Sequence, residues 1–139
     1  MSREVFDLNN ANGLFVTNAP CIKCIVYGVP LSDSPALYKE CDFYLDTGAD
    51  EFAAIPYDTI MEVGGKKTGE TITLVDFEEN RYPKDIYAVS LKIDRLELNE
   101  TVEAIISHKP YCILPRKIMS EWKIEISWQE NKLCITPNE

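Results

Sequence analysis

The chain has 139 residues, of which 45% are hydrophobic, and its formal net charge is −9. This length and hydrophobic fraction predict one folded domain, residues 1–139, and exclude a disordered chain. The negative charge, without a cluster of Lys and Arg, argues against a nucleic-acid partner. The sequence has no run of the roughly 20 apolar residues that a membrane helix needs, and no signal peptide, so we expect no membrane partner and a cytoplasmic location.

Turn residues recur along the chain and the apolar runs between them are short, which is typical of a mostly β domain. We expect residues 1–20 to be an N-terminal extension and residues 21–136 to form the core. Strands are predicted where β-branched and aromatic residues gather, loops where Gly, Pro and Ser gather, and a helical turn after Pro56. In the first half these are strands at 14–17, 22–27 and 38–45, loops at 28–35 and 64–69, and a helical turn at 56–61.

The second half of the chain begins with a predicted hairpin. Polar and apolar residues alternate from Thr71 to Val75, which is the pattern of a strand with one buried face. A polar connection at 76–85 would join the strand at 70–75 to a second strand at 86–93. The remaining predicted elements are strands at 101–106 and 111–114, a helix within 116–122, and a closing hairpin of strands 123–128 and 132–136.

The chain has five cysteines, and an odd number without a secretory signal predicts reduced thiols. Cys21 and Cys24 have the C-x-x-C spacing found in zinc and redox sites. A second such pair is missing, and the only histidine, His108, lies far away in the sequence. We therefore predict no metal and no cofactor, and we keep a zinc-binding protein as an alternative.

One short motif carries possible chemistry. Residues 45–49 read Leu-Asp-Thr-Gly-Ala and directly follow a predicted strand. A carboxylate at the end of a rigid strand is well positioned, and Gly48 permits a tight turn and a close approach of the backbone to a substrate. The hydroxyl of Thr47 can both donate and accept a hydrogen bond. The same residue types are common in surface turns, which is the other interpretation.

A second motif follows about 65 residues later, where residues 113–116 read Ile-Leu-Pro-Arg before the predicted helix. Together the two motifs resemble the retropepsin-like, or retroviral-type, aspartic proteases. That family has a strand, Asp-Thr-Gly-Ala, a flap hairpin, two strands, then two apolar residues, Gly-Arg and a helix. The resemblance covers roughly residues 20–136. It implies an all-β, acid-protease half-barrel with one short C-terminal helix, assembled as a two-fold homodimer.

The resemblance also implies roles for the residues of the first motif. Asp46 would be the catalytic carboxylate, and Thr47 would hydrogen-bond across the dimer axis. Gly48 would offer its backbone to the substrate, and Ala49 and Asp50 would contact the substrate as well.

Further roles follow for the flap and for the second motif. The flap tip would lie within residues 76–81, so that Asp76 and Phe77 would contact the substrate. Arg116 would support the site by pairing with Asp50, because a guanidinium can hold a carboxylate through two hydrogen bonds. The C-terminal strand, residues 132–136, would form part of the dimer interface.

The sequence departs from the family pattern in three respects. Viral flaps are rich in glycine, whereas residues 76–81 contain none. Pro115 stands where the family has glycine, and proline both removes a backbone donor and restricts φ. Lys117 stands where the family has an acidic or amide residue.

Only one Asp-Thr-Gly occurs in the chain, so a two-carboxylate mechanism requires a second copy of the chain. Two close carboxylates share one proton, and one then acts as a general base on water while the other polarises the scissile carbonyl. The expected function is an aspartic endopeptidase that hydrolyses peptide bonds in a peptide or protein substrate. The alternative is a catalytically silent binding or dimerisation module with the same fold.

Overall fold

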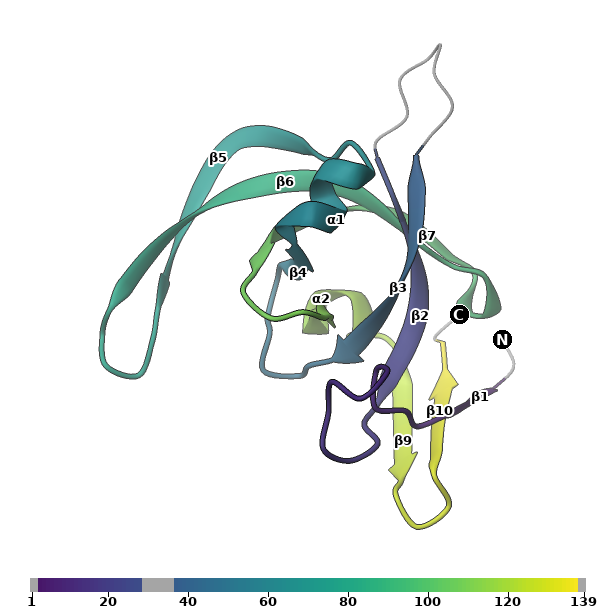
Figure 1. Cartoon of the computed structure of the whole chain (residues 1–139). Helices are drawn as coiled ribbons and strands as arrows, with labels where there is room; N and C mark the ends of the chain where they lie inside the picture. Colours follow the sequence, from purple (N-terminus) through teal and green to yellow (C-terminus); the bar gives the residue numbers. More distant parts are fainter. Residues whose placement is uncertain (1–2, 29–36, 138–139) are drawn as a thin grey trace.

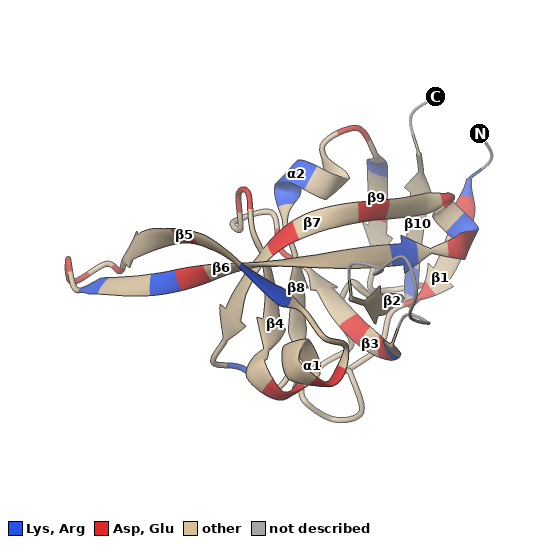
Figure 2. Cartoon of the chain, turned by 90° about the horizontal axis from the view of Figure 1, so that it is seen from above, with Lys and Arg blue, Asp and Glu red and all other residues tan. Residues whose placement is uncertain are grey.

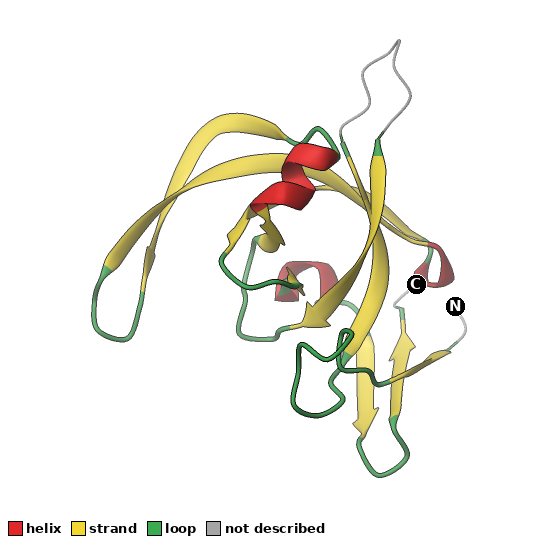
Figure 3. Ribbon diagram, viewed as in Figure 1, coloured by secondary structure: helices red, strands yellow, loops and turns green. Residues whose placement is uncertain are grey.

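Ten strands, two short α-helices and one 3₁₀-helix make up the part of the chain that this computed structural model describes, residues 3–28 and 37–137 (Figures 1 and 3). The predicted mostly β fold class is confirmed. Of the predicted loop at 28–35, only Gly28 lies within the described residues. The strands are β1 (Glu4–Asp7), β2 (Cys21–Tyr27), β3 (Tyr38–Leu45), β4 (Ala53–Pro56), β5 (Lys66–Val75), β6 (Arg81–Ile93), β7 (Leu98–Ser107), β8 (Cys112–Leu114), β9 (Lys123–Ser127) and β10 (Lys132–Thr136). The helices are α1 (Tyr57–Glu62), the 3₁₀-helix η1 (Asp94–Leu96) and α2 (Arg116–Met119).

The larger of two sheets closes into a barrel. Its strand order is β2-β3-β8-β4-β7-β6-β5, and a further pairing joins β2 to β6. Strand β2, at one end of the sheet, pairs with β3 along its whole length and with β6 through Ile25, Val26 and Tyr27, which closes the ring of strands from β2 to β6. Strand β5 lies outside this closed ring and pairs only with β6 in the described chain.

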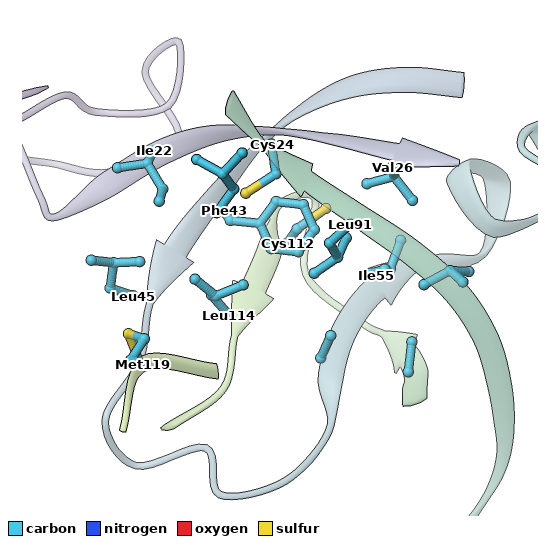
Figure 4. Packing of buried hydrophobic residues seen from close by; sticks show 14 of the residues in the cluster. Ile22, Cys24, Val26, Phe43, Leu45, Ile55, Leu91, Cys112, Leu114 and Met119 are labelled. Carbon is cyan, nitrogen blue, oxygen red and sulfur yellow. The ribbon is translucent and has the colours of Figure 1, made fainter. Parts of the chain in front are cut away.

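The interior of the barrel holds the hydrophobic core. Phe43 of β3 is paired on one side with Ile22 of β2 and on the other with Cys112 of β8. Directly paired residues face the same side of a sheet, so these three side chains point inward together. Figure 4 shows Phe43 surrounded by other buried side chains from several strands. Phe43 has none of its surface exposed.

A second, smaller sheet has the order β1-β10-β9 and brings the two ends of the chain together (Figure 1). Leu133 and Ile135 of β10 have no exposed surface, because they join the core cluster. Strand β10 pairs with β1 on one edge and with β9 on the other. Both edges of β10 are therefore occupied within the described chain, and its place in a dimer interface stays a prediction.

Some predicted elements are wrong in type or in length. Residues 14–17 form turns and bends, not a strand. The flap strands β5 and β6 extend into the regions 66–69 and 81–85, which we expected to be loops, and α2 ends at Met119 and not near residue 122. Strands β1 and β4 were not predicted at all. No helix in the described part of the chain is long and apolar enough to cross a membrane.

The core position of Phe43 gives a stability prediction. We expect Phe43→Ala to lower the free energy of unfolding by about 3–5 kcal/mol, because it removes a large buried side chain and leaves a cavity. The matched control is Phe77→Ala, which truncates a fully exposed phenylalanine and should change that free energy by less than about 0.5 kcal/mol. Urea unfolding at a single protein concentration measures both variants. Equal losses would contradict this description of the core.

Candidate active site

Asp46 directly follows β3, and its position is set by the pairing of β3 with β8. These two strands run parallel, in register from Phe43 opposite Cys112 to Leu45 opposite Leu114. The backbone N–H of Asp46 then donates to the carbonyl of Leu114, with an N–O distance of 3.3 Å. Leu45, the last residue of β3, is buried, whereas Asp46, which follows it, is half-buried. The carboxylate therefore emerges from a rigid strand at the edge of the core.

The loop after β3 folds back on the Asp46 carboxylate. The N–H of Gly48 donates to Oδ1 of Asp46 at 2.8 Å, and the N–H of Ala49 donates to the carbonyl of Asp46 at 3.2 Å. A Cβ atom on Gly48 would lie only 3.1 Å from the same Oδ1, which is closer than an ordinary contact. Glycine thus leaves room for the carboxylate. Thr47 and Gly48 are both exposed in the single chain.

Helix α2 anchors the other end of this loop. Its first two residues donate backbone N–H groups to the loop: Arg116 to the carbonyl of Ala49 at 2.7 Å, and Lys117 to the carbonyl of Asp50 at 2.9 Å. These N–H groups have no partner within the helix, so the loop satisfies them. Pro115, which precedes the helix, is buried with φ −83°, close to the value that its ring imposes. Proline, which has no backbone N–H, is therefore accommodated immediately before α2.

The expected ion pair between Arg116 and Asp50 forms. Nη2 of Arg116 lies 2.8 Å from Oδ1 of Asp50, and Nη1 donates to the carbonyl of Thr47 at 3.4 Å. Figure 2 shows the basic start of α2, and Lys117 lies within 3.8 Å of Glu51 in the same loop. The side chains of Arg116 and Asp50 are 57% and 82% exposed, so the pair contributes at most about 1 kcal/mol to stability. Its main effect is to orient the loop.

Strands β5 and β6 form the predicted flap, a long hairpin that projects from the barrel (Figures 1 and 2). The pairing register shifts between Lys67 and Thr71, and Gly69 in this bulge has φ +88°. The hydroxyl of Thr68 closes the bulge by donating to the carbonyl of Ile86 at 3.1 Å and accepting the N–H of Glu70. Bulges increase the twist and bend of a strand, which accounts for the curved hairpin.

The tip of the flap, residues 76–80, is organised by a carboxylate in place of glycine. Oδ1 of Asp76 accepts the N–H groups of Glu78 and Asn80, both at 2.9 Å. Oδ2 accepts the side-chain amide of Asn80 at 3.1 Å and the hydroxyl of Tyr82 at 3.0 Å. Glu79 takes the left-handed conformation, with φ +64°, at a position where glycine is the usual residue. Phe77 is left fully exposed.

The C-x-x-C pair does not form a chelating site. Both cysteines lie on β2, and residues three apart on a strand point to opposite faces. Cys24 belongs to the core cluster, whereas Cys21 is buried outside that cluster. Within residues 3–28 and 37–137, no three His, Cys, Asp or Glu side chains are arranged to hold a metal ion. The observed strand thus favours the simpler interpretation of Cys21 and Cys24 as strand residues.

The structure divides the predicted site residues into two groups. Six of them lie together where the β3 loop meets α2: Asp46, Thr47, Gly48, Ala49, Asp50 and Arg116. Asp76 and Phe77 lie apart from them, at the flap tip (Figure 1). Sequence reasoning missed the contributions of Asn80 and Tyr82, although the spacing of Asp76 and Asn80 around a turn was a usable signal.

The hydrogen bonds at the flap tip give a titration prediction. They hold the pKa of the Asp76 carboxyl below its usual value, chiefly through the N–H of Asn80. Because this pKa is lowered, the carboxylate-bound tip is complete above the ordinary aspartate pKa of about 3.9 and is lost as the pH falls through the lowered value. We expect Tyr82→Phe, which removes one donor, to raise the pKa of Asp76 toward its usual value.

A carbon-detected NMR titration of the Asp76 carboxyl group measures this shift. The matched control is Tyr38→Phe, which removes the same hydroxyl from an exposed tyrosine on β3, far from Asp76 in the sequence. An ordinary pKa for Asp76 in the unmodified protein would contradict the described tip.

Comparison with solved structures identifies the fold. A crystal structure of a retropepsin-like aspartic protease from Rickettsia conorii matches with a TM-score of 0.54 and 18% sequence identity, over 96% of this chain and 92% of that one. The EIAV protease complexed with the inhibitor HBY-793 matches with a TM-score of 0.49 and 16% identity, over 76% of this chain and 88% of that one. No protein-family model and no curated protein matches the sequence. On the first of these structural likenesses, this chain has a retropepsin-like fold.

Proposed function

We propose that this protein is an aspartic endopeptidase whose active site forms between two copies of the chain, with one Asp46 from each. The observation that carries the proposal is the loop around Asp46. Its carboxylate follows a buried strand and accepts the N–H of Gly48, and the end of the same loop is held by backbone N–H groups of α2. This arrangement occurs on a fold that the chain shares with a retropepsin-like aspartic protease.

In the proposed mechanism the two Asp46 carboxylates hold one proton between them, because two adjacent negative charges are unfavourable. The ionised carboxylate removes a proton from a water molecule, and the water oxygen attacks the peptide carbonyl carbon. The protonated carboxyl donates a hydrogen bond to the carbonyl oxygen. The tetrahedral intermediate then collapses, the C–N bond breaks, and the leaving amine takes a proton.

The other loop residues would bind the substrate and close the dimer. In this proposal Thr47 hydrogen-bonds across the two-fold axis, which is consistent with its exposure in the single chain. Gly48 and Ala49 present backbone groups to the substrate, and Asp50, oriented by Arg116, contacts the substrate backbone.

In this proposal the flap hairpin completes the substrate-binding site. Phe77 is the large apolar side chain exposed at its tip, so we assign it the substrate contact. The Asp76 carboxylate already accepts four hydrogen bonds within the tip, so we assign it the role of positioning Phe77. A flap organised by its own side chains is compatible with a defined binding position for Phe77.

The first functional prediction concerns Asp46. Asp46→Asn should reduce peptide cleavage by a factor on the order of 10⁴, because asparagine keeps the shape of the side chain but can neither accept nor release the catalytic proton. The measurement is digestion of a broad peptide library, read by mass spectrometry. Circular dichroism should show that the variant remains folded.

The matched control for this variant is Asp94→Asn, the same substitution on η1, where the Asp94 side chain makes a surface ion pair with Lys92. It should retain full activity. Equal cleavage by Asp46→Asn and the unmodified protein would show that the activity comes from a contaminant. No cleavage by the unmodified, folded dimer would favour the catalytically silent module.

The second functional prediction concerns the shared site. Adding an excess of Asp46→Asn protein to a fixed amount of unmodified protein should suppress cleavage, because most unmodified subunits then pair with an inactive partner. Adding the same excess of Asp94→Asn protein should not suppress it. Sedimentation velocity should show a homodimer for all three proteins. Cleavage that is insensitive to the Asp46→Asn subunit, from a protein that sediments as a monomer, would exclude a two-copy site.

A further inference from the structure

Three cysteines gather on the inner face of the barrel wall. Cys24 of β2 lies directly opposite Cys41 of β3, and Cys112 of β8 lies opposite Phe43, two residues further along β3. Residues two apart on a strand face the same side, and so do directly opposed residues. The three thiols therefore point to the same side of the sheet. Figure 4 shows two of them, Cys24 and Cys112, beside Phe43.

The three thiols differ in their access to solvent. Cys24 and Cys112 are buried, with 1% and 3% of their surface exposed, whereas Cys41 is half-buried. A hollow on the surface is lined by Cys41 and Cys112, together with residues such as Lys39 and Thr59. A small water-soluble reagent can enter this hollow and reach Cys41, so Cys41 is the thiol of the three that meets it first.

Cys41 is also the thiol that ionises most readily. The neighbouring Cys112 can donate a hydrogen bond to its charged form, and this holds the pKa of the Cys41 thiol below its usual value, with a smaller contribution from Lys39. Burial raises the pKa of Cys24 well above its usual value. The thiolate is the reactive form of cysteine, so these pKa shifts favour reaction at Cys41, which is also the thiol that solvent reaches most easily.

We propose that these cysteines form a peroxide-sensitive site in which Cys41 is oxidised first and Cys24 then closes a disulfide with it. The Cys41 thiolate attacks one oxygen of hydrogen peroxide, the O–O bond breaks, and Cys41 becomes a sulfenic acid as the other oxygen leaves as hydroxide and is protonated to water. The Cys24 sulfur then attacks the Cys41 sulfur, and the S–O bond breaks. The departing hydroxide takes the Cys24 proton. Two thiols are oxidised and one peroxide is reduced, with two molecules of water formed when the oxidant is hydrogen peroxide.

The strand register favours Cys24 over Cys112 as the second partner. Directly opposed residues of an antiparallel pair have Cα atoms about 4.5–5.5 Å apart, within the range of about 4.4–6.8 Å that a disulfide needs. Cys112 is displaced by two residues along β3 from the position opposite Cys41, where Cα separations are about 7–8 Å. Cys112 would therefore activate Cys41 by donating a hydrogen bond to its thiolate, and Cys24 would form the disulfide with Cys41.

The test is to treat the folded, full-length protein with hydrogen peroxide and map its disulfides without reduction. Cleavage after Lys and Arg places each of the five cysteines on a separate peptide, so every pairing is distinguishable. We expect a peptide linked through Cys24 and Cys41, and its loss on treatment with dithiothreitol. Cys41→Ser should abolish the linked peptide and leave Cys24 reduced. The matched control Cys134→Ser changes a buried cysteine of the smaller sheet and should leave the linked peptide in place.

Several outcomes would overturn the proposal. One is a disulfide between Cys41 and Cys112, and another is a Cys41 that stops at the sulfenic or sulfinic acid while Cys24 stays reduced. The others are oxidation of Cys24 in the Cys41→Ser variant and no oxidation of the folded protein. If Cys41→Ser does not fold, the map of the unmodified protein decides the question alone. The site uses none of the residues proposed for catalysis, so its test is independent of the peptidase assay.

Discussion

The parallel pairing of β3 with β8 is the constraint on which the candidate site depends. It brings together two motifs that are far apart in the sequence, the Asp-Thr-Gly loop after Leu45 and the turn into α2 after Leu114. Parallel neighbours cannot be joined by a tight turn, so the intervening chain must cross over and return. That intervening chain forms β4, α1, the flap and β7, which supply most of the remaining barrel. The geometry around Asp46 is therefore a product of the whole fold.

Two of the departures from the family pattern, the glycine-free flap tip and Pro115, are accommodated by local physical chemistry. At the flap tip, the turn that glycine would permit by its conformational freedom is instead stabilised by the four hydrogen bonds to Asp76. At the start of α2, Pro115 occupies a position that needs no N–H donor, and Arg116 and Lys117 make the contacts with the loop. Both substitutions exchange backbone freedom for a defined conformation. A hairpin tip of this kind would vary less in shape than a glycine-rich one.

Sequence reasoning worked best where a pattern was local. The bounds predicted for β3 and β10 agree with the structure, and β2 differs by one residue, because each segment contains β-branched or aromatic residues and lies between turn residues. Strands β1 and β4 have four residues each, and β4 ends in proline, so neither gives a recognisable period. The extra length of β5 and β6 comes from their pairing with each other, which overrides the polar composition of their ends. Hydrogen bonds between loop and helix backbones, such as Arg116 to Ala49, leave no trace in residue types.

The interlocking of the chain ends has a consequence for biosynthesis. Strand β1 is synthesised before the other described strands, but its partner in the ladder is β10, so that Glu4 pairs with Ile135. Contacts this distant in sequence form slowly because a long loop must close before they stabilise anything. The barrel strands, by contrast, are complete once Leu114 has been added. Strand β1 therefore lacks its partner until every barrel strand has been synthesised, and the small sheet can be completed only after that point.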